Sequence, residues 1–311
     1  MSYLGNLTLR LAAGAARLAE PLRRRHAAYL AGQQNADGGF SGQQGPSDPY
    51  YTGFALRGLA LLGTLDGRAA SGAAGFLQQR LAQATPLASI DFLSLVSSAV
   101  LLEVTCGIDV FAGAGLDRRK AVAAALEPLA RDDGGYAMSQ RSGPSSTYHT
   151  FLAAACLELV GLPLEQAPRM ADLIRSRQRS DGGFVELDPM QHGGTNPTAA
   201  AVGLLRLLGA LDASTAEQAA AFLARAQNLE GGLRANTGIP MADLLSTFTG
   251  LVALADLDAL ARVDRRAAQR YVETLELADG GFRPTAWDNA TDVEYTFYGL
   301  GSCALLAAAA G

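Results

Sequence analysis

The sequence predicts an all-α protein, a closed α/α toroid (an α6-α6 barrel) made of six helical-hairpin repeats of about 48 residues. Three observations lead to this prediction. A glycine-pair phrase recurs at a near-constant spacing, each copy separates a charged segment from an apolar one, and both segments have the periodicity of helices. Hydrophobic residues make up 49% of the 311 residues and charged residues 18%. This composition supplies a large continuous core and gives no sign of a disordered linker.

The glycine pairs set the register of the repeats. They begin at Gly38, Gly134, Gly182, Gly231 and Gly280, so the successive spacings are 96, 48, 49 and 49 residues. The first spacing covers two periods, because no pair occurs near residue 86. We therefore predict a single domain over residues 1–311, in which a leading amphipathic helix over residues 1–23 precedes six repeats over about residues 24–311.

Each repeat is predicted to begin with an amphipathic outer helix, such as residues 216–227. After the glycine pair and a loop comes an inner helix with hardly any charge. The inner helices are expected at residues 51–62, 92–102, 149–160, 198–208, 246–255 and 295–309. A helix that is apolar nearly all round is buried on both sides, so these helices must lie between the outer helices and a central space. An open solenoid is the alternative, but it needs polar end repeats, and the last repeat here is the most apolar.

The glycine phrase itself, for example residues 34–40 (QNADGGF), is interpreted as a helix C-cap with its first glycine in the left-handed conformation. The aspartate before the glycines is expected to hydrogen-bond the backbone of the turn. Short polar residues then start the inner helices as N-caps. The predicted N-caps are Asp48, Ser146, Asp243 and Asp292, with Asn196 in the fourth repeat.

The first turns of the inner helices hold the candidate site, because they meet at one mouth of the central space. A carboxylate, Glu294, and an imidazole, His149, fall in this layer. Aromatic residues are only 7% of the chain, yet they concentrate in these helices. Apolar pockets with a few convergent polar groups are the usual ligand sites, although core packing explains such aromatics equally well. The predicted binding residues of this wall are Tyr51, Tyr148, Phe248, Tyr295 and Tyr298.

Composition excludes several classes of protein. The net charge of −5 comes without a basic patch, which argues against nucleic-acid binding. The three cysteines are too few and too widely spaced for a disulfide framework or a metal cluster, which favours a reducing cytoplasm. No apolar stretch reaches the roughly 20 residues that span a bilayer, so no transmembrane segment is expected. The preference for Arg and Ala suggests a GC-rich bacterial genome.

The repeat, its DGGF turn and residues 291–306 (TDVEYTFYGLGSCALL) resemble the β subunits of protein prenyltransferases, especially type II geranylgeranyltransferase. The superfamily also includes class II terpenoid cyclases. The resemblance covers about residues 24–310 and implies an isoprenoid or its diphosphate as the ligand. It also implies a helical partner subunit and a catalytic zinc held by Asp, Cys and His.

The positions that match the family's zinc ligands are Asp243, Leu245 and Tyr295, so only one ligand is retained and zinc is not expected. Mg²⁺ is the ion that a diphosphate substrate would bring. Arg234 is the cation nearest the place where the resemblance puts the diphosphate.

The cyclase branch implies an acidic motif at the start of an inner helix, which Asp292 and Glu294 resemble. A carboxylic acid in an apolar pocket has a raised pKa and can donate a proton, and aromatic faces stabilise the cation that forms. The candidate catalytic residues are therefore Asp292, Glu294, His149 and Asp243. Three hypotheses stay open: zinc-independent prenyl transfer, cyclisation with Asp292 and Glu294 as the acid pair, and a non-catalytic member that binds a lipid or a helical partner protein.

Overall fold

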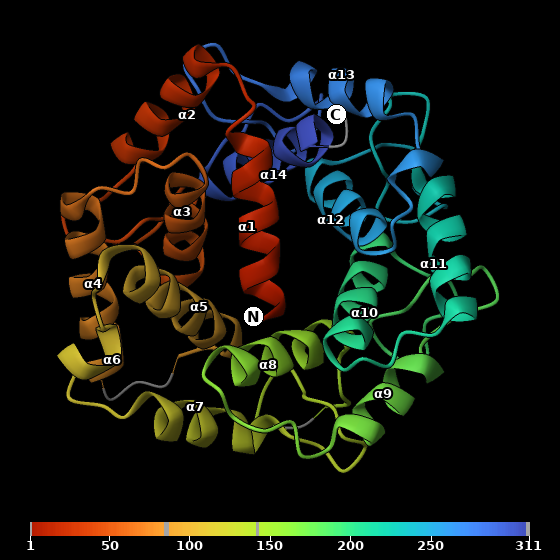
Figure 1. Ribbon diagram of the computed structural model, residues 1–311, viewed down its shortest axis with the longest axis horizontal. Helices are drawn as coiled ribbons and strands as arrows, with labels where there is room; N and C mark the ends of the chain where they lie inside the picture. Colours follow the sequence, from red (N-terminus) through yellow and green to blue (C-terminus); the bar gives the residue numbers. More distant parts are fainter. Residues whose placement is uncertain (1, 84–86, 141–142, 309–311) are drawn as a thin grey trace.

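A computed structural model describes residues 2–83, 87–140 and 143–308. Over these residues the helices form two concentric layers, as predicted (Figure 1). The inner layer consists of α3 (Pro49–Leu61), α5 (Ser89–Cys106), α8 (Thr147–Leu159), α10 (Thr195–Leu207), α12 (Leu244–Asp256) and α14 (Val293–Ala308). The outer layer consists of α2 (Glu20–Gly32), α4 (Gly67–Ala82), α7 (Arg118–Leu126), α9 (Ala167–Ser176), α11 (Ala213–Ala226) and α13 (Arg265–Leu275).

The inner helices form a closed ring. Each packs against the next in chain order, and α14 packs against α3, so the first and last repeats meet. The prediction of a closed toroid is therefore confirmed. Four further segments complete the helical structure in the described ranges: α1 (Tyr3–Ala15), α6 (Val110–Gly113), and the 3₁₀ turns Glu127–Leu129 and Leu260–Arg262.

The N-caps of the inner helices follow the prediction except in the fourth repeat. The side chains of Asp48, Ser146 and Asp243 each accept a hydrogen bond from the backbone N–H three residues later. In the fourth repeat the cap is Gly194, and Asn196 lies inside the first turn of α10. The prediction that Asn196 is a cap was wrong because glycine gives no polar side chain by which to recognise it, although glycine is itself an accepted N-cap residue.

Each glycine phrase forms a turn between an outer and an inner helix, so its interpretation as a helix C-cap was wrong. Helix α9 ends well before Gly182, and an isolated β-bridge between Gln178 and Phe184 closes the turn. The expected positive φ is confirmed, since φ lies between 84° and 97° at the first glycine of every pair. The expected aspartate contact is also present, for example from the Gly183 N–H to Asp181 Oδ1 at 3.0 Å.

The turn ties each outer helix to the following one. A Cβ at Gly182 would lie 2.5 Å from the carbonyl oxygen of Gln218 in α11. Gln178 strengthens this contact, because its side-chain amide donates to the carbonyls of Gly182 at 3.1 Å and Thr215 at 3.4 Å. The contact repeats round the ring, and in the last repeat Gly280 packs against α2.

Helix α1 lies across one end of the ring (Figure 1). Its Tyr3 hydroxyl and Arg10 guanidinium both donate to the buried Asp256 carboxylate, at 2.7 and 2.8 Å. Gly14 approaches Ala304 so closely that a Cβ would lie 2.1 Å from its carbonyl oxygen. The predicted leading helix over residues 1–23 is therefore too long, because α1 ends at Ala15 and the first outer helix starts at residue 20, with Pro21 in its first turn.

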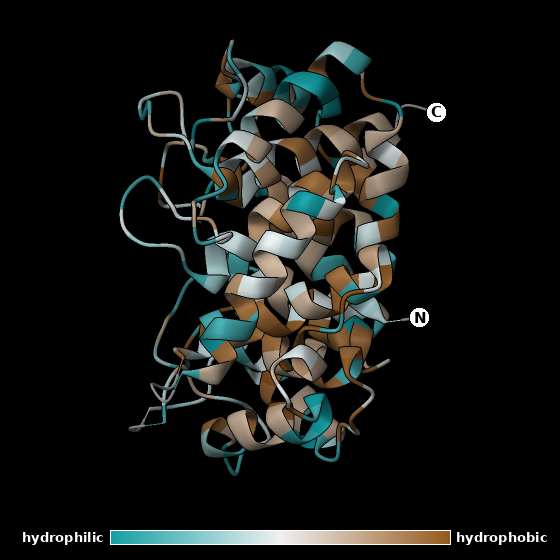
Figure 2. Ribbon diagram, turned by 90° about the vertical axis from the view of Figure 1, so that its left-hand side faces the viewer, coloured by the Kyte–Doolittle hydropathy of each residue, from teal (hydrophilic) through white to brown (hydrophobic). Residues whose placement is uncertain are grey.

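The two ends of the ring differ. The long loops that follow the glycine turns gather on one side, and the chain termini lie on the opposite side (Figure 2). Helix α5 is long and apolar enough, by length and composition, to cross a membrane, which the sequence analysis did not expect. A buried core helix passes the same test, and α5 packs against α3 and α8 in the ring.

Candidate functional site

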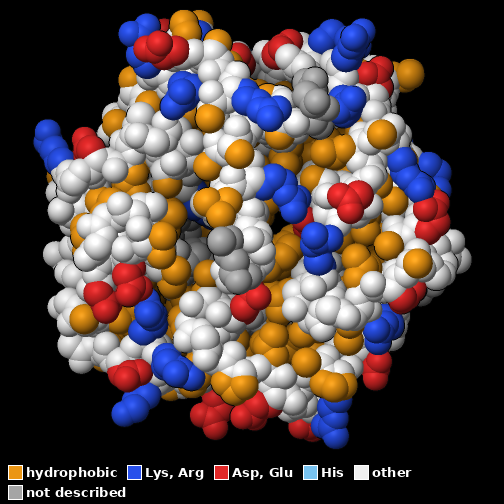
Figure 3. All heavy atoms as spheres, in the orientation of Figure 1, with side chains coloured by type: hydrophobic (Ala, Val, Ile, Leu, Met, Phe, Trp, Pro, Cys, Tyr) orange, Lys and Arg blue, Asp and Glu red, His pale blue; other side chains and the backbone are white. Residues whose placement is uncertain are grey.

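A cavity of about 460 Å³ occupies the centre of the ring. Side chains from all six inner helices line it, and Tyr3, Leu4 and Leu7 of α1 close part of one end. Hydrophobic side chains also fill the hollows beside α1 on the face seen in Figure 3. The cavity falls in the size range of small-molecule sites, and its wall is mainly apolar with a few polar groups.

One register position recurs in the wall. In five of the six inner helices the residue two positions after the N-cap lines the cavity near the helix N-terminus. These residues are Tyr50, Ile90, Tyr148, Asn196 and Leu245. The sixth residue, Glu294 in α14, is not among the lining residues, but its carboxylate hydrogen-bonds two tyrosines that are. Asn196 thus belongs to the cavity wall, although its sequence position suggested a helix cap.

Glu294 is the acidic residue at this register position. Its Oε1 accepts hydrogen bonds from the Tyr50 hydroxyl at 2.6 Å and the Tyr298 hydroxyl at 2.9 Å. No hydrogen bond reaches Oε2 from any residue in the described ranges. Burial raises the pKa of Glu294, while the two tyrosine hydrogen bonds and the charge of Arg57 act to lower it. The net direction is upward, which favours the neutral acid.

The other predicted carboxylates cap helices. Asp292 Oδ1 accepts from the backbone N–H groups of Glu294 at 2.9 Å and Tyr295 at 3.0 Å. Asp243 Oδ1 accepts from the N–H of Ser246 at 2.7 Å. Burial raises the pKa of both carboxyls, but neither side chain is part of the cavity lining. The catalytic roles predicted for Asp292 and Asp243 stay predictions, and the geometry gives both residues a structural task.

Aromatic rings form the apolar wall beside Glu294. Phe248 stacks on Tyr298 with ring centroids 5.3 Å apart, and Phe297 meets Phe248 edge to face at 5.4 Å. Tyr148 also lines the cavity, as predicted together with Phe248 and Tyr298. Tyr51 and Tyr295 are not among the lining residues. Each instead packs its ring against a tyrosine that is connected to Glu294.

Arg57 brings the positive charge to the cavity wall. Its Nε donates to the carbonyl of Gly53, one turn earlier in α3, at 3.0 Å. Its guanidinium carbon lies 4.2 Å from the ring centroid of Phe54 and 4.9 Å from that of Phe297. The two terminal nitrogens have no hydrogen-bond partner among the described residues. The sequence signal for this residue was its charge on an otherwise apolar helix.

Three further polar residues of the wall were not predicted. Glu186, from the loop before α10, accepts from the Ser146 hydroxyl and from the backbone N–H of Tyr148. The Thr249 hydroxyl donates to Asn196 Oδ1 at 2.6 Å. Glu186 has no repeat-based signal, because it lies in a loop and is held by the start of the neighbouring α8.

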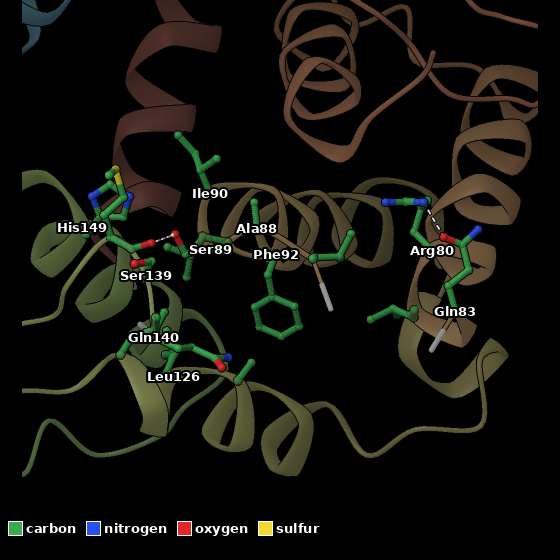
Figure 4. A pocket seen from close by; sticks show the side chains of 16 residues that line it. Arg80, Gln83, Ala88, Ser89, Ile90, Phe92, Leu126, Ser139, Gln140 and His149 are labelled. Atoms are coloured by element: carbon green, nitrogen blue, oxygen red, sulfur yellow. Dashed lines mark hydrogen bonds between the residues drawn. The ribbon is translucent and has the colours of Figure 1, made fainter. Parts of the chain in front are cut away.

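His149 lies in the first turn of α8, as predicted, but it is not among the residues that line the central cavity. It borders a groove of about 680 Å³ between α4, α5, α7 and the loop before α8 (Figure 4). Its Nδ1 lies 3.0 Å from the Ser146 hydroxyl, and burial lowers its pKa. It sits three positions after its N-cap, one position beyond the residue that faces the cavity. The groove and the cavity share Ile90 and Leu93.

Arg234 lies outside the central cavity, which contradicts its predicted place in the site. It borders a surface hollow with Trp287 and Met241. Its guanidinium donates to the carbonyls of Ala226 at 3.1 Å and Arg225 at 2.7 Å, so it fastens the end of α11.

The retained family positions do not fit zinc. The Asp243 carboxylate caps α12, the next position is the apolar Leu245 of the cavity wall, and Tyr295 replaces an imidazole. In the described part of the chain, no three His, Cys, Asp or Glu side chains gather as a metal site requires.

Comparisons with known proteins agree with this architecture. The family model of the prenyltransferase alpha-alpha toroid domain matches residues 23–90, 76–239 and 200–310. A comparison with the sequences of curated proteins gives no match.

Several solved structures share the fold. Protein geranylgeranyltransferase-I of Candida albicans, complexed with GGPP, is 14% identical with a TM-score of 0.72, and the match covers 91% of each chain. A variant of the type II terpene cyclase MstE from Scytonema, in complex with its substrate geranylgeranyl dihydroxybenzoate, is 16% identical with a TM-score of 0.60 over 98% of this chain and 99% of that one. A protein from Actinoplanes is 19% identical with a TM-score of 0.59 over 93% and 99%.

Proposed function

The chain belongs to the family of prenyltransferase alpha-alpha toroid domains, and from this membership and the cavity we propose that it is an enzyme that binds an isoprenoid in the centre of the ring and protonates it from Glu294 without zinc. Isoprenoid binding is supported by two structural neighbours, one complexed with GGPP and the other with geranylgeranyl dihydroxybenzoate. The acid-initiated step rests on this chain's own residues.

The observation that carries the proposal is the environment of Glu294. An isoprenoid double bond is a weak base, so its protonation needs a neutral acid in a site that excludes water. Burial raises the pKa of Glu294, and the hydroxyls of Tyr50 and Tyr298 hold its Oε1 in place. Both hydroxyls engage the same oxygen, which leaves Oε2 as the atom to carry the proton.

In the proposed step the O–H bond of Glu294 breaks and its proton adds to one carbon of a double bond. The π electrons form the new C–H bond, and the neighbouring carbon becomes a cation. A second double bond of the same chain supplies the electrons that close a ring, and the final cation loses a proton. Glu294 regains one proton, so the net reaction is an isomerisation that needs no oxidant, reductant or second substrate.

The aromatic wall offers the carbocation two pairs of rings, which differ in how close they lie to the charge of Arg57. Phe54 and Phe297 already lie under the Arg57 guanidinium, whose charge repels a second cation. Phe248 and Tyr298 stack on each other beside Glu294, and neither is one of the two rings over which the guanidinium lies, although the charge of Arg57 also acts on the Tyr298 hydroxyl. Ring faces attract cations, so we place the carbocation over this pair.

Transfer from an isoprenoid diphosphate is supported less well. Among the described residues that line the cavity, Arg57 is the one cation, and the carboxylate of Glu186 belongs to the same wall. A diphosphate is normally held by several cationic groups, so this cavity would need added Mg²⁺ to accept one.

The test is product formation from C10 to C30 isoprenoids, followed by chromatography and mass spectrometry because the expected products are isomers of the substrates. Glu294→Gln should lower the rate at least about 100-fold, since a general acid contributes about 10²- to 10⁴-fold, while the substrate still binds. Asp292→Asn is the matched control, because asparagine caps a helix as well as aspartate does. Loss of product with Asp292→Asn but not with Glu294→Gln would reject Glu294 as the acid.

A further inference from the structure

The guanidinium of Arg57 is a charged group of the cavity wall that the proposed protonation does not use. It is partly buried, and its terminal nitrogens have no hydrogen-bond partner in the described part of the chain. Arginine stays charged in proteins, and a charge that is withdrawn from water without a counter-ion is costly. The terminal nitrogens are not among the fully buried atoms, so they are open to an anion that enters the cavity.

The groups around Arg57 do not supply that anion. The groups that interact with it electrostatically include the Tyr298, Tyr148 and Tyr50 hydroxyls, which are neutral at physiological pH, and Glu294. Under the proposed function Glu294 must be protonated when it acts. Glu186, a carboxylate that does line the cavity, is engaged by the Ser146 hydroxyl and the Tyr148 N–H at the start of α8.

We propose that Arg57 binds a carboxylate head group of the substrate, so that the ligand of this cavity is an isoprenoid acid with one negative charge and not a neutral hydrocarbon or a diphosphate. The inference rests on the proposed function and specifies its substrate class. The planar guanidinium fork presents two N–H groups side by side, which matches the two oxygens of a carboxylate.

In this arrangement the charged head group and the reacting double bond occupy different parts of the cavity. The head group is placed beside Arg57, Phe54 and Phe297, and the double bond that is protonated lies near Glu294, Phe248 and Tyr298. A bound carboxylate offsets the charge of Arg57, which otherwise favours ionisation of Glu294. Binding of the correct substrate therefore favours the protonated acid that the reaction needs.

The experiment compares the binding of four C20 ligands by equilibrium dialysis: geranylgeranoic acid, its methyl ester, geranylgeraniol and geranylgeranyl diphosphate. The wild-type protein should bind the acid about 10- to 100-fold more tightly than the ester, which is the usual contribution of charge-assisted hydrogen bonds. Arg57→Met should remove this preference while leaving the ester unaffected. Arg57→Lys should keep part of it, because lysine retains the charge without the fork.

The surface variant Arg24→Met is the matched control, because Arg24 is exposed on α2 and its loss changes the net charge equally. Its preference for the acid should equal that of the wild type. Thermal unfolding without ligand shows whether Arg57→Met is folded, because the variant loses the hydrogen bond to the Gly53 carbonyl and the guanidinium contacts with Phe54 and Phe297. A folded Arg57→Met that keeps the wild-type preference for the acid would overturn the inference.

The binding results separate this inference from the proposed function. Equal binding of the acid and the ester would overturn the carboxylate subsite and leave isoprenoid binding intact. Tighter binding of the diphosphate than of the acid, lost in Arg57→Met, would overturn the single-charge head group and favour transfer. Failure of all four ligands to bind would reject the proposed function and the inference together.

Discussion

At the scale of single residues, the cavity depends on which side chains are held by their neighbours and which are free. The carboxylates of Asp292 and Asp243 accept hydrogen bonds from helix N-terminal N–H groups, whereas the Glu294 carboxylate accepts from two tyrosine hydroxyls of the cavity wall. Three carboxylates that look alike in the sequence thus have different tasks. The difference comes from register, because a cap and the residue two positions beyond it face different directions.

Glu294→Gln should change the pH dependence of stability. The folded-state pKa of Glu294 is raised above its ordinary value of 4.5, so the folded state binds the proton more tightly than the unfolded chain does. Its contribution to stability is therefore present at low pH and is lost as the pH rises through the raised pKa. Glutamine keeps an acceptor for both tyrosines and cannot ionise.

Thermal unfolding of the wild type and Glu294→Gln from pH 4 to pH 8 measures this effect. The variant should gain in melting temperature relative to the wild type as the pH rises. A difference that is constant over this range would mean that Glu294 has an ordinary pKa and is a poor candidate for the acid.

At the scale of elements, the glycine turns hold the ring together. The last turn, residues 276–281, packs against α2, and we call this contact the α2 seam. Each turn brings its first glycine against the next outer helix. This close contact explains why the glycine pair recurs although the turns take no part in the proposed reaction. In the last repeat Glu276 stands where three of the other four turns have glutamine, at residues 34, 178 and 227; the turn at Gly134 has Ala130. Glu276 contacts the guanidinium of Arg25, and its Oε1 lies 3.0 Å from His26 Nε2.

Gly182→Ala should destabilise the fold by more than about 1 kcal/mol, because alanine must adopt φ of +84° and also meets the Gln218 carbonyl. Gly45→Ala separates the two causes, since Gly45 has φ of +101° and a Cβ added there would meet no described atom within 4 Å. Urea unfolding should show the larger loss for Gly182→Ala. Equal losses would mean that backbone strain alone explains the turn.

The α2 seam should make the stability of the fold fall at acid pH. Burial and the charge of Arg25 lower the pKa of His26 to about 4, and its Nδ1 accepts the Gly281 N–H at 3.0 Å. A depressed histidine pKa stabilises the fold above the ordinary value of 6.5, and that stability is lost as the pH falls towards 4. The loss should approach about 3 kcal/mol at pH 4.

His26→Asn removes the titration and keeps a polar acceptor near Gly281. Its unfolding free energy should fall less steeply between pH 6.5 and pH 4 than that of the wild type, although Glu276 and Arg25 remain at the seam. His192→Asn, at an exposed loop position, is the control and should keep the wild-type slope. An unchanged slope in His26→Asn would place the acid sensitivity elsewhere.

At the scale of the whole molecule, ring closure creates the site from residues that are far apart in the sequence. The bond between Tyr50 and Glu294 joins the first and last inner helices. The periodic glycines and apolar segments were sufficient to predict the toroid. Periodicity says nothing of the loop residue Glu186, which is held by the neighbouring α8, or of Arg57, which meets Phe297 only where the ring closes.

The sequence also could not place α1. An amphipathic leading segment predicts a helix, but its position across the end of the ring depends on tertiary partners such as Asp256 and the close contact of Gly14 with α14. His149 was misplaced because a one-residue step along a helix turns a side chain by about 100° and moves it to another hollow. Arg234 lies in the loop between α11 and α12, where helical register gives no guide to its position.

Asp256→Ala should loosen α1 without opening the ring. It leaves the Tyr3 hydroxyl and the Arg10 guanidinium without their shared acceptor, while α12 keeps its packing against α10 and α14. Hydrogen exchange should become faster over Tyr3–Ala15 and stay slow in α12, with a smaller effect for Asp256→Asn. Faster exchange spread evenly over all inner helices would contradict a local role for α1.

The most direct test of the central claim is the reaction of a bound isoprenoid in D₂O. If Glu294, after exchange with solvent, donates the first proton, the product should carry one deuterium at the carbon that is protonated. Glu294→Gln should give neither product nor label, while Asp292→Asn gives both. A product without deuterium, or a labelled product from Glu294→Gln at the wild-type rate, would contradict protonation by Glu294.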